Sequence, residues 1–139
     1  MMVCESLTLA VRNSEDIVHA RQAVRSKAVQ LGFSLIDQTK LVTAASELAR
    51  NTVDHGRGGT MLLEHLEDGE QRGIRLTFED QGPGIRDIEQ ALRDGYSTGS
   101  GLGMGLGGAR RLVNDFEIRS TPGEGTTIVV ARWTWKLPR

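Results

Sequence analysis

The chain has 139 residues, of which 38% are apolar and 25% are charged, and its formal net charge is −1. This length suits one hydrophobic core, so we expect a single domain over residues 1–139. The near-neutral charge argues against a nucleic-acid binder, which usually carries a basic face. The single cysteine, Cys4, excludes an internal disulfide and argues against a thiolate metal site, and the three histidines are too scattered to indicate a zinc cluster.

No apolar run reaches the roughly 20 residues that a membrane span needs. The N-terminus also lacks the apolar segment of a secretory signal. We therefore expect a cytoplasmic protein that does not bind membranes.

The first two expected elements are a strand and a helix. Apolar and polar residues alternate over Ser6–Arg12, which predicts a half-buried strand with Leu7 on its covered face. Ser14 is the expected N-cap of the helix that follows, and Gly32 is its expected stop. Its apolar stripe consists of Ile17, Ala20, Val24, Ala28 and Leu31.

A second, longer helix is expected from Ser34 to about Asp54, because Ser34 with Asp37 resembles a capping arrangement. Its core stripe is Leu41, Ala45, Leu48 and Thr52. Glu47 and Asn51 lie four residues apart, so they share one side of this helix. Alone, this pair is weak evidence for a site, because most such pairs lie on a solvated helix face.

Two strands, 60–66 and 73–79, are joined by a polar turn and predict a hairpin. A short helix should follow, with Asp87 as N-cap, Gln90 three residues later and Gly95 as stop. The polar run Tyr96–Ser100 reads either as a lid over a pocket or as a plain surface connection.

The C-terminal part predicts a helix over about 106–114 and strands over 116–120 and 126–135, the last in the interior of the sheet. The order of elements indicates an α+β two-layer sandwich with a mixed, mostly antiparallel sheet and helices on one face.

The stretch from Asp80 to Gly108 holds the chemistry that we expect of a nucleotide pocket. Asp80 closes an alternating strand and enters D-Q-G-P-G, which places a carboxylate at a tight turn. The glycines 101, 103 and 105 precede an apolar helix, an arrangement whose free N–H groups favour phosphate.

Other nucleotide folds fit this stretch less well. The dinucleotide motif G-x-G-x-x-G occurs at residues 103–108, but no buried strand precedes it and too little chain follows for a doubly wound sheet. A P-loop is absent, as are the motifs of the eukaryotic-type protein kinases.

Four motifs in order resemble those of the GHKL ATPase and kinase superfamily, which includes histidine kinases, gyrase and Hsp90. They are E-L-A-R-N at 47–51, D-Q-G-P-G at 80–84, G-L-G-M-G-L at 101–106 and G-E-G-T-T at 123–127. The match spans nearly the whole chain and implies the Bergerat fold of that superfamily. Among its small members, the wording of these motifs is similar to the RsbT-type switch kinases of bacterial stressosomes.

The resemblance implies ATP and Mg²⁺ as cofactors and assigns roles to matching residues. Asn51 would be the Mg²⁺ ligand, Glu47 the catalytic carboxylate, and Asp80 the acceptor for the adenine amino group, with Thr126 helping. Gly82 and Gly84 would let the backbone meet the base. The remaining ATP-binding residues would be Gly101, Leu102, Gly103, Gly105 and Leu106.

The resemblance further implies a serine/threonine-protein kinase that phosphorylates a STAS-domain scaffold or antagonist, and that activates a downstream effector such as a PP2C-type phosphatase. Two alternatives remain open. The His55-Gly56 pair is more like the anti-sigma-factor kinases, whose partner is a sigma factor. A nucleotide-gated binding module without transferase activity is the other. The roles of His55, Arg110 and Arg111 stay unassigned.

Overall fold

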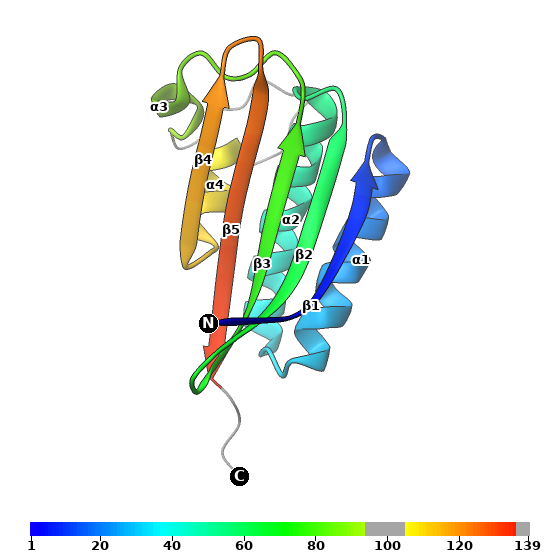
Figure 1. The fold of residues 1–139 in the computed structure, drawn as a ribbon, viewed down its shortest axis with the longest axis vertical. Coiled ribbons are helices and arrows are strands. Elements are labelled where there is room, and N and C mark those ends of the chain that lie inside the picture. The colour runs from blue at the N-terminus through cyan, green and yellow to red at the C-terminus, as the bar shows by residue number, and fades with distance from the viewer. Residues whose placement is uncertain (94–104, 136–139) are drawn as a thin grey trace.

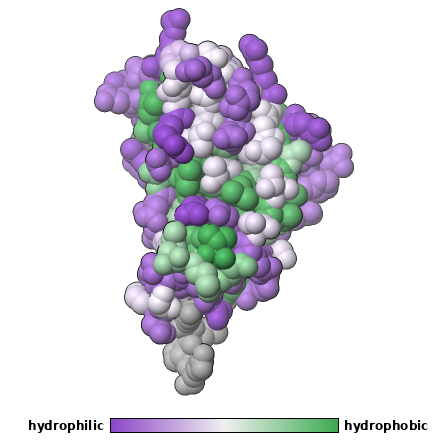
Figure 2. Space-filling model, viewed as in Figure 1, coloured by the Kyte–Doolittle hydropathy of each residue, from purple (hydrophilic) through white to green (hydrophobic). Residues whose placement is uncertain are grey.

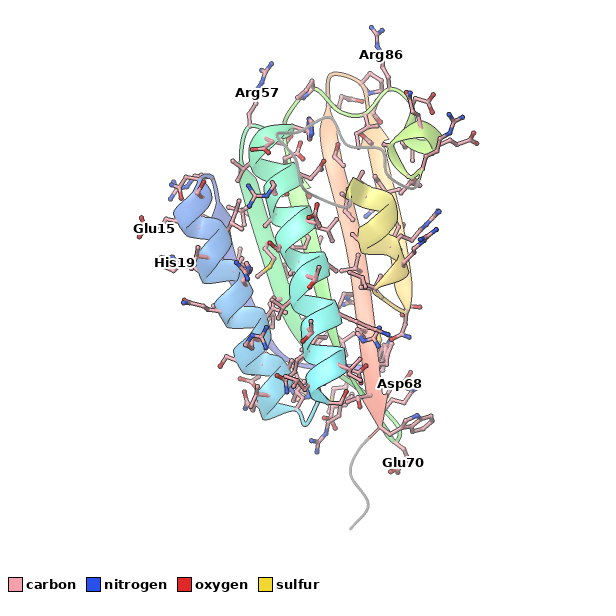
Figure 3. All side chains as sticks on the ribbon, turned by 180° about the vertical axis from the view of Figure 1, so that it is seen from behind. Glu15, His19, Arg57, Asp68, Glu70 and Arg86 are labelled. Atoms are coloured by element: carbon pink, nitrogen blue, oxygen red, sulfur yellow. The ribbon has the colours of Figure 1, made fainter. Side chains whose placement is uncertain are left out.

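A computed structural model describes residues 1–93 and 105–135, and it contains a sheet with helices packed on one of its faces (Figures 1 and 3). The strands are β1 (Met2–Val11), β2 (Gly59–Asp68), β3 (Gln71–Asp80), β4 (Asp115–Thr121) and β5 (Gly125–Trp135). The helices are α1 (Ser14–Gln30), α2 (Leu35–Asp54), α3 (Ile88–Ala91) and α4 (Gly105–Arg111).

The sheet has five strands in the order β1-β2-β3-β5-β4. Every neighbouring pair within the described residues is antiparallel, so the parallel pair of a mixed sheet is not found there. The strand β5 lies between β3 and β4, which confirms its predicted interior position. The α+β sandwich with helices on one face is therefore confirmed.

The core forms where α1, α2 and α4 meet the sheet. The predicted stripes of α1 and α2 are all buried, and alternate residues of the strands complete the core, among them Met61, Leu76, Phe78, Ile128 and Val130. The other face of the sheet is not covered by any described helix and shows apolar side chains between charged ones (Figure 2).

Local capping differs from the prediction at one helix and agrees at two. The N-cap of α1 is Asn13, whose side chain accepts a hydrogen bond from the Asp16 N–H, so the prediction of Ser14 was wrong by one residue. Asn is as good an N-cap as Ser, and only the backbone path selects between neighbours. The caps at Ser34 and Asp87 are confirmed.

Three further boundaries differ. The first strand starts at Met2, and Leu7 is 47% exposed, because β1 is an edge strand that α1 covers only at its later residues. The helix α4 ends at Arg111, three residues before the predicted end. Gly95 and the candidate lid, residues 96–100, lie outside the described residues.

One contact ties three elements together on the helix side of the sheet. Arg132 on β5 donates to the Asp37 carboxylate at the start of α2, with Nη2 2.5 Å from Oδ1. Its other terminal nitrogen donates to the Leu112 carbonyl just after α4.

None of the described helices is both long enough and apolar enough to span a membrane.

Candidate functional site

Asp80 is the last residue of β3, and its side chain is buried, with 6% of the residue exposed. One carboxylate oxygen, Oδ1, accepts a hydrogen bond from the Gly82 N–H at 2.9 Å. The turn therefore folds back on the carboxylate and fixes its direction, as the D-x-G-x-G pattern predicts. A buried carboxylate with only part of its accepting capacity used is suited to recognise a ligand donor.

Gly56, in the loop after α2, lies directly against this carboxylate. A Cβ at residue 56 would overlap the Asp80 carboxyl carbon and Oδ2, and a Cβ at residue 82 would lie 2.7 Å from the Gly56 Cα. These three residues thus form an interlocked contact that tolerates no side chain on either glycine. Gly56 was not among the predicted site residues, although its place in the H-G pair after the asparagine motif was the available signal.

Thr126, on β5, is the strand partner of Asp80 and is also buried. Its hydroxyl lies 2.8 Å from the Ser120 hydroxyl on β4. Ser120 in turn accepts from the Ile85 N–H at 2.7 Å and donates to the Gly125 carbonyl at 3.1 Å. The side chain of Ser120 therefore connects Thr126 to the loop after Asp80.

Ser120 was missed by the sequence reasoning. It stands in phase with Phe116 and Ile118 on its strand, and this periodicity would have placed it on the helix-facing side with Thr126.

Gly84 and Gly125 let two loops approach each other and the end of β3. Gly84 has φ +76°, and a Cβ there would overlap the Thr121 carbonyl oxygen. Gly125 has φ +101°, and a Cβ there would overlap the carbonyl oxygen of Asp80. Because both backbones are in the left-handed region, a side chain would be strained as well as crowded. Contact with a nucleobase stays a prediction for Gly82 and Gly84.

Glu47 and Asn51 are half-buried on the last turns of α2. The carbonyl oxygen of Asn51 accepts from the N–H groups of His55 at 2.9 Å and Gly56 at 3.2 Å. The end of α2 is thus folded directly onto the glycine that contacts Asp80. The end of α2 lies at the same end of the sheet as the end of β3 (Figure 1). Asn51, near the end of α2, therefore lies at the end that holds Asp80 and Thr126, with Glu47 one helical turn further away.

The glycine-rich motif is described only at its end. Gly101, Leu102 and Gly103 lie outside the described residues. Gly105 starts α4 with φ +69°, and Leu106 is 5% exposed and belongs to the core. The Leu106 side chain is therefore part of the hydrophobic core.

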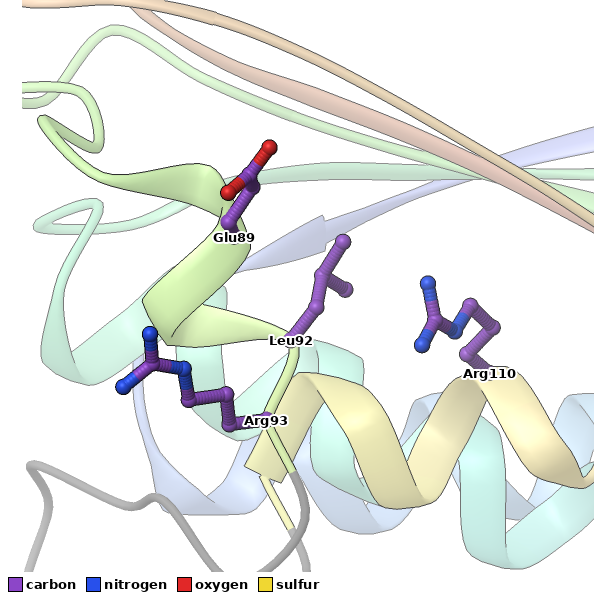
Figure 4. Close-up of a pocket in the computed structure, with 4 residues that line it drawn as sticks. All are labelled: Glu89, Leu92, Arg93 and Arg110. Atoms are coloured by element: carbon purple, nitrogen blue, oxygen red, sulfur yellow. The ribbon is translucent and has the colours of Figure 1, made fainter.

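Two open pockets lie at this end of the molecule. The first is lined by the residues around the ends of the strands, Glu79, Asp80, Gln81, Arg119, Ser120, Thr121, Glu124, Gly125, Thr126 and Thr127. The second lies between α3 and α4 and is lined by Glu89, Leu92, Arg93 and Arg110 (Figure 4).

At the second pocket, the end of α3 packs closely against α4. A Cβ at Gly107 would overlap the Leu92 carbonyl oxygen, so the glycine lets α3 pack onto α4. Arg93 and Arg110 stand on the two sides of Leu92 (Figure 4). Their guanidinium groups make this pocket suitable for an anionic group.

Comparison with protein families gives a match over residues 36–137 to the model described as histidine kinase-, DNA gyrase B- and HSP90-like ATPase. The matched range includes most of α2, Asp80, α4 and Thr126. The superfamily that the four motifs suggested is therefore confirmed.

Two relatives align with this chain over most of the length of both proteins. The serine/threonine-protein kinase RsbT of Bacillus subtilis (strain 168) is 46% identical over 118 residues, which are 85% of this chain and 89% of the relative. The anti-sigma F factor of Pasteuria penetrans is 34% identical over 122 residues, 83% of this chain and 81% of the relative. The resemblance to RsbT-type kinases is thereby confirmed.

Solved structures agree at the level of the fold. The mycobacterial sensor histidine kinase MprB aligns with a TM-score of 0.55 at 18% identity, and covers 96% of this chain and 100% of its own. The catalytic domain of histidine kinase ThkA aligns with a TM-score of 0.51 at 14% identity, with 95% of both chains covered. The match over residues 36–137 shows that the chain belongs to the family of histidine kinase-, DNA gyrase B- and HSP90-like ATPases.

Proposed function

We propose that this chain is a protein serine/threonine kinase that uses Mg-ATP to phosphorylate a STAS-domain scaffold or antagonist protein in a bacterial partner-switching pathway of the cytoplasm. The observation that carries the proposal is the interlock between Asp80 and the loop that ends α2. It joins the expected adenine-binding residue to the helix of Glu47 and Asn51, in a chain 46% identical to a serine/threonine-protein kinase.

Asp80 is the proposed acceptor for the adenine amino group. A carboxylate only accepts hydrogen bonds, so it suits the exocyclic NH₂ of adenine and disfavours the O6 acceptor of guanine. Thr126 lies beside it in the sheet register, with its hydroxyl held by Ser120. In this arrangement Thr126 assists Asp80, either directly or through a water molecule.

Asn51 is the proposed ligand for Mg²⁺. The fit is chemical, because Mg²⁺ takes oxygen ligands and needs few from the protein when phosphates and waters supply the rest. Asn51 offers an amide oxygen from the last turn of α2, and Glu47 offers a carboxylate one turn earlier. When bound, the ion would neutralise charge on the triphosphate.

Glu47 is the proposed catalytic residue. In the transfer, the acceptor hydroxyl oxygen bonds to the γ-phosphorus, the bond to the bridging oxygen breaks, and ADP leaves. Glu47 accepts or orients the hydroxyl proton. Because phosphoryl transfer depends mainly on positioning and charge neutralisation, few other side chains are needed. Release of the phosphorylated partner would free the kinase to activate an effector such as a PP2C-type phosphatase.

The experiment is a transfer assay with γ-labelled ATP and a STAS-domain protein from the same organism. We expect the label on the STAS protein with the wild-type chain, and a fall of about a hundredfold or more with Glu47→Ala, at nearly unchanged ATP affinity. Asp54→Ala is the control, because Asp54 is an exposed acid at the end of the same helix. ATP binding without any transfer by the wild type would instead support a nucleotide-gated binding module.

A second candidate function is an anti-sigma factor with serine kinase activity. It is favoured by the 34% identity to an anti-sigma F factor and by the His55-Gly56 pair, whose glycine contacts Asp80. Under this alternative the chain captures a sigma factor and a single-domain antagonist in a pull-down. Capture of a STAS scaffold and no sigma factor supports the switch kinase.

A further inference from the structure

Cys4, His65 and Glu67 form a cluster at the end of the sheet away from Asp80. Arg57 and Arg86 mark the end that holds the nucleotide site, and Asp68 and Glu70 mark the opposite end (Figure 3). The strand β1 has an irregularity in register between Val3 and Glu5, where Cys4 is the extra residue. Glu5 pairs with His65, so the bulge brings Cys4 beside the same histidine.

The three side chains bring their possible ligand atoms together. One ligand atom from each of Cys4, His65 and Glu67 lies within 4.8 Å of the other two. A tetrahedral zinc ion with bonds of 2.0–2.3 Å holds its ligand atoms about 3.3–3.8 Å apart. Side-chain shifts on the order of 1 Å would therefore close this cluster around an ion.

His65 is only partly used by the protein's own groups. Its Nε2 lies 2.9 Å from the Glu67 carboxylate, and its side chain is 12% exposed. Its Nδ1 is buried and has no hydrogen-bond partner. A cation bound between Nε2 and the Glu67 carboxylate would replace the hydrogen bond between them and leave Nδ1 facing the Glu5 carboxylate, which is 3.8 Å away. A metal on one ring nitrogen and a carboxylate facing the other is the usual arrangement of a metal-binding histidine.

Two cations lie beside the cluster, and one of them, Arg72, pairs with the ligand Glu67 itself. The Lys27 ammonium is 2.9 Å from the Glu5 carboxylate, and Arg72 is 3.4 Å from that of Glu67. A bound ion would therefore share the Glu67 carboxylate with Arg72.

We propose that Cys4, His65 and Glu67 are a binding site for a thiophilic divalent cation of the zinc class, with water completing the coordination. Thiolate, imidazole and carboxylate together suit Zn²⁺ rather than Mg²⁺, which takes oxygen ligands. The ion joins the bulge of β1 to β2 and so fastens the edge strand. A single cysteine and scattered histidines gave no sign of this in the sequence, because the bulge alone brings them together.

The test is titration of the full-length chain with Zn²⁺ in competition with a chromophoric chelator, followed by Co²⁺ substitution. We expect one Zn²⁺ per chain and, with Co²⁺, the sulfur-to-cobalt charge-transfer band. Cys4→Ser should remove this band, and Cys4→Ser and His65→Gln should each weaken Zn²⁺ binding by about tenfold or more.

His19→Gln is the matched control, because His19 is an exposed histidine on α1 (Figure 3). It should keep both the affinity and the band. Asn51→Ala should also keep them, which separates this site from the proposed Mg²⁺ ligand. Circular dichroism verifies that each variant is folded, and Cys4 is exposed, so its replacement should leave the fold intact.

Two results overturn the proposal. One is wild-type protein that binds no stoichiometric Zn²⁺ in the competition assay. The other is a Cys4→Ser variant whose Zn²⁺ affinity and cobalt spectrum match those of the wild type. Neither result bears on the kinase proposal, because Cys4 and His65 lie outside the nucleotide site.

Discussion

The carboxylate of Asp80 lies directly against the Cα of Gly56, so the end of β3 and the loop after α2 form one rigid corner. Gly59, three residues after Gly56, is the strand partner of Asp80, which closes the same corner through the backbone. The proposed adenine acceptor and the helix of the proposed Mg²⁺ ligand are therefore positioned by a single packing contact.

Gly56→Ala should displace the Asp80 carboxylate. The new methyl group would overlap that carboxylate, and crowding of a packed site costs about 1–3 kcal/mol in the free energy of unfolding. We expect a loss of this size in urea unfolding, together with weaker ATP binding in calorimetry.

Gly69→Ala is the comparison for this variant. Gly69 has φ +63° but nothing near its Cβ position, and it lies in the hairpin at the other end of the sheet. The Gly69→Ala variant should lose stability through backbone strain and keep its ATP affinity. Equal ATP affinities in the two variants would contradict the role given to Gly56.

Ser120→Ala should weaken the nucleotide site without touching a ligand. The change leaves the Ile85 N–H and the Thr126 hydroxyl without their shared partner, which costs about 1–3 kcal/mol in stability. We expect lower stability and a several-fold weaker ATP affinity, measured by thermal shift with and without ATP. Ser6→Ala, an exposed serine on the edge strand β1, should change neither.

The ion pair of Asp37 with Arg132 predicts that the free energy of unfolding falls in acid. The hydrogen bond from Arg132 lowers the pKa of Asp37 below its ordinary value of 3.8. A lowered pKa in the folded state means that the stabilisation is fully present above 3.8 and is lost as the pH falls through that value towards the lower one.

Asp37→Asn should remove this contribution, of roughly 1 kcal/mol for a partly exposed pair. Urea unfolding at neutral pH and near pH 3 checks it. The difference between wild type and variant should shrink in acid, whereas Asp68→Asn, at an exposed position, should show little difference at either pH. A difference between wild type and Asp37→Asn that grows in acid would have the wrong sign.

Much of the fold followed from local patterns in the sequence. The pair Ser34 and Asp37 predicted where α2 begins, and the apolar stripe predicted its length and its buried side. Both predictions succeed because capping and periodicity act within one helix. The choice of Asn13 over Ser14 as N-cap and the exposure of Leu7 did not follow, since they depend on how the chain enters α1 and on which part of β1 the helix covers.

The sequence identified the candidate site residues that stand in motifs, and it missed those that act through packing. Asp80, Thr126 and Asn51 stand in recognisable motifs, and the fold brings them to one end of the sheet. Gly56 and Ser120 act through contacts between segments far apart in sequence, which local patterns do not encode.

The central claim is that Asp80 and Asn51 belong to one binding site for Mg-ATP. The most direct test of this claim is the ATP affinity measured by calorimetry, with and without Mg²⁺. Asp80→Asn should lose about ten- to a hundredfold, or roughly 1.5–3 kcal/mol, in both conditions, because it removes a charge-assisted hydrogen bond to the base. Asn51→Ala should lose only the part that depends on Mg²⁺. Glu70→Gln, at an exposed position in the hairpin at the other end of the sheet, should match the wild type. Full ATP affinity in Asp80→Asn would contradict the account.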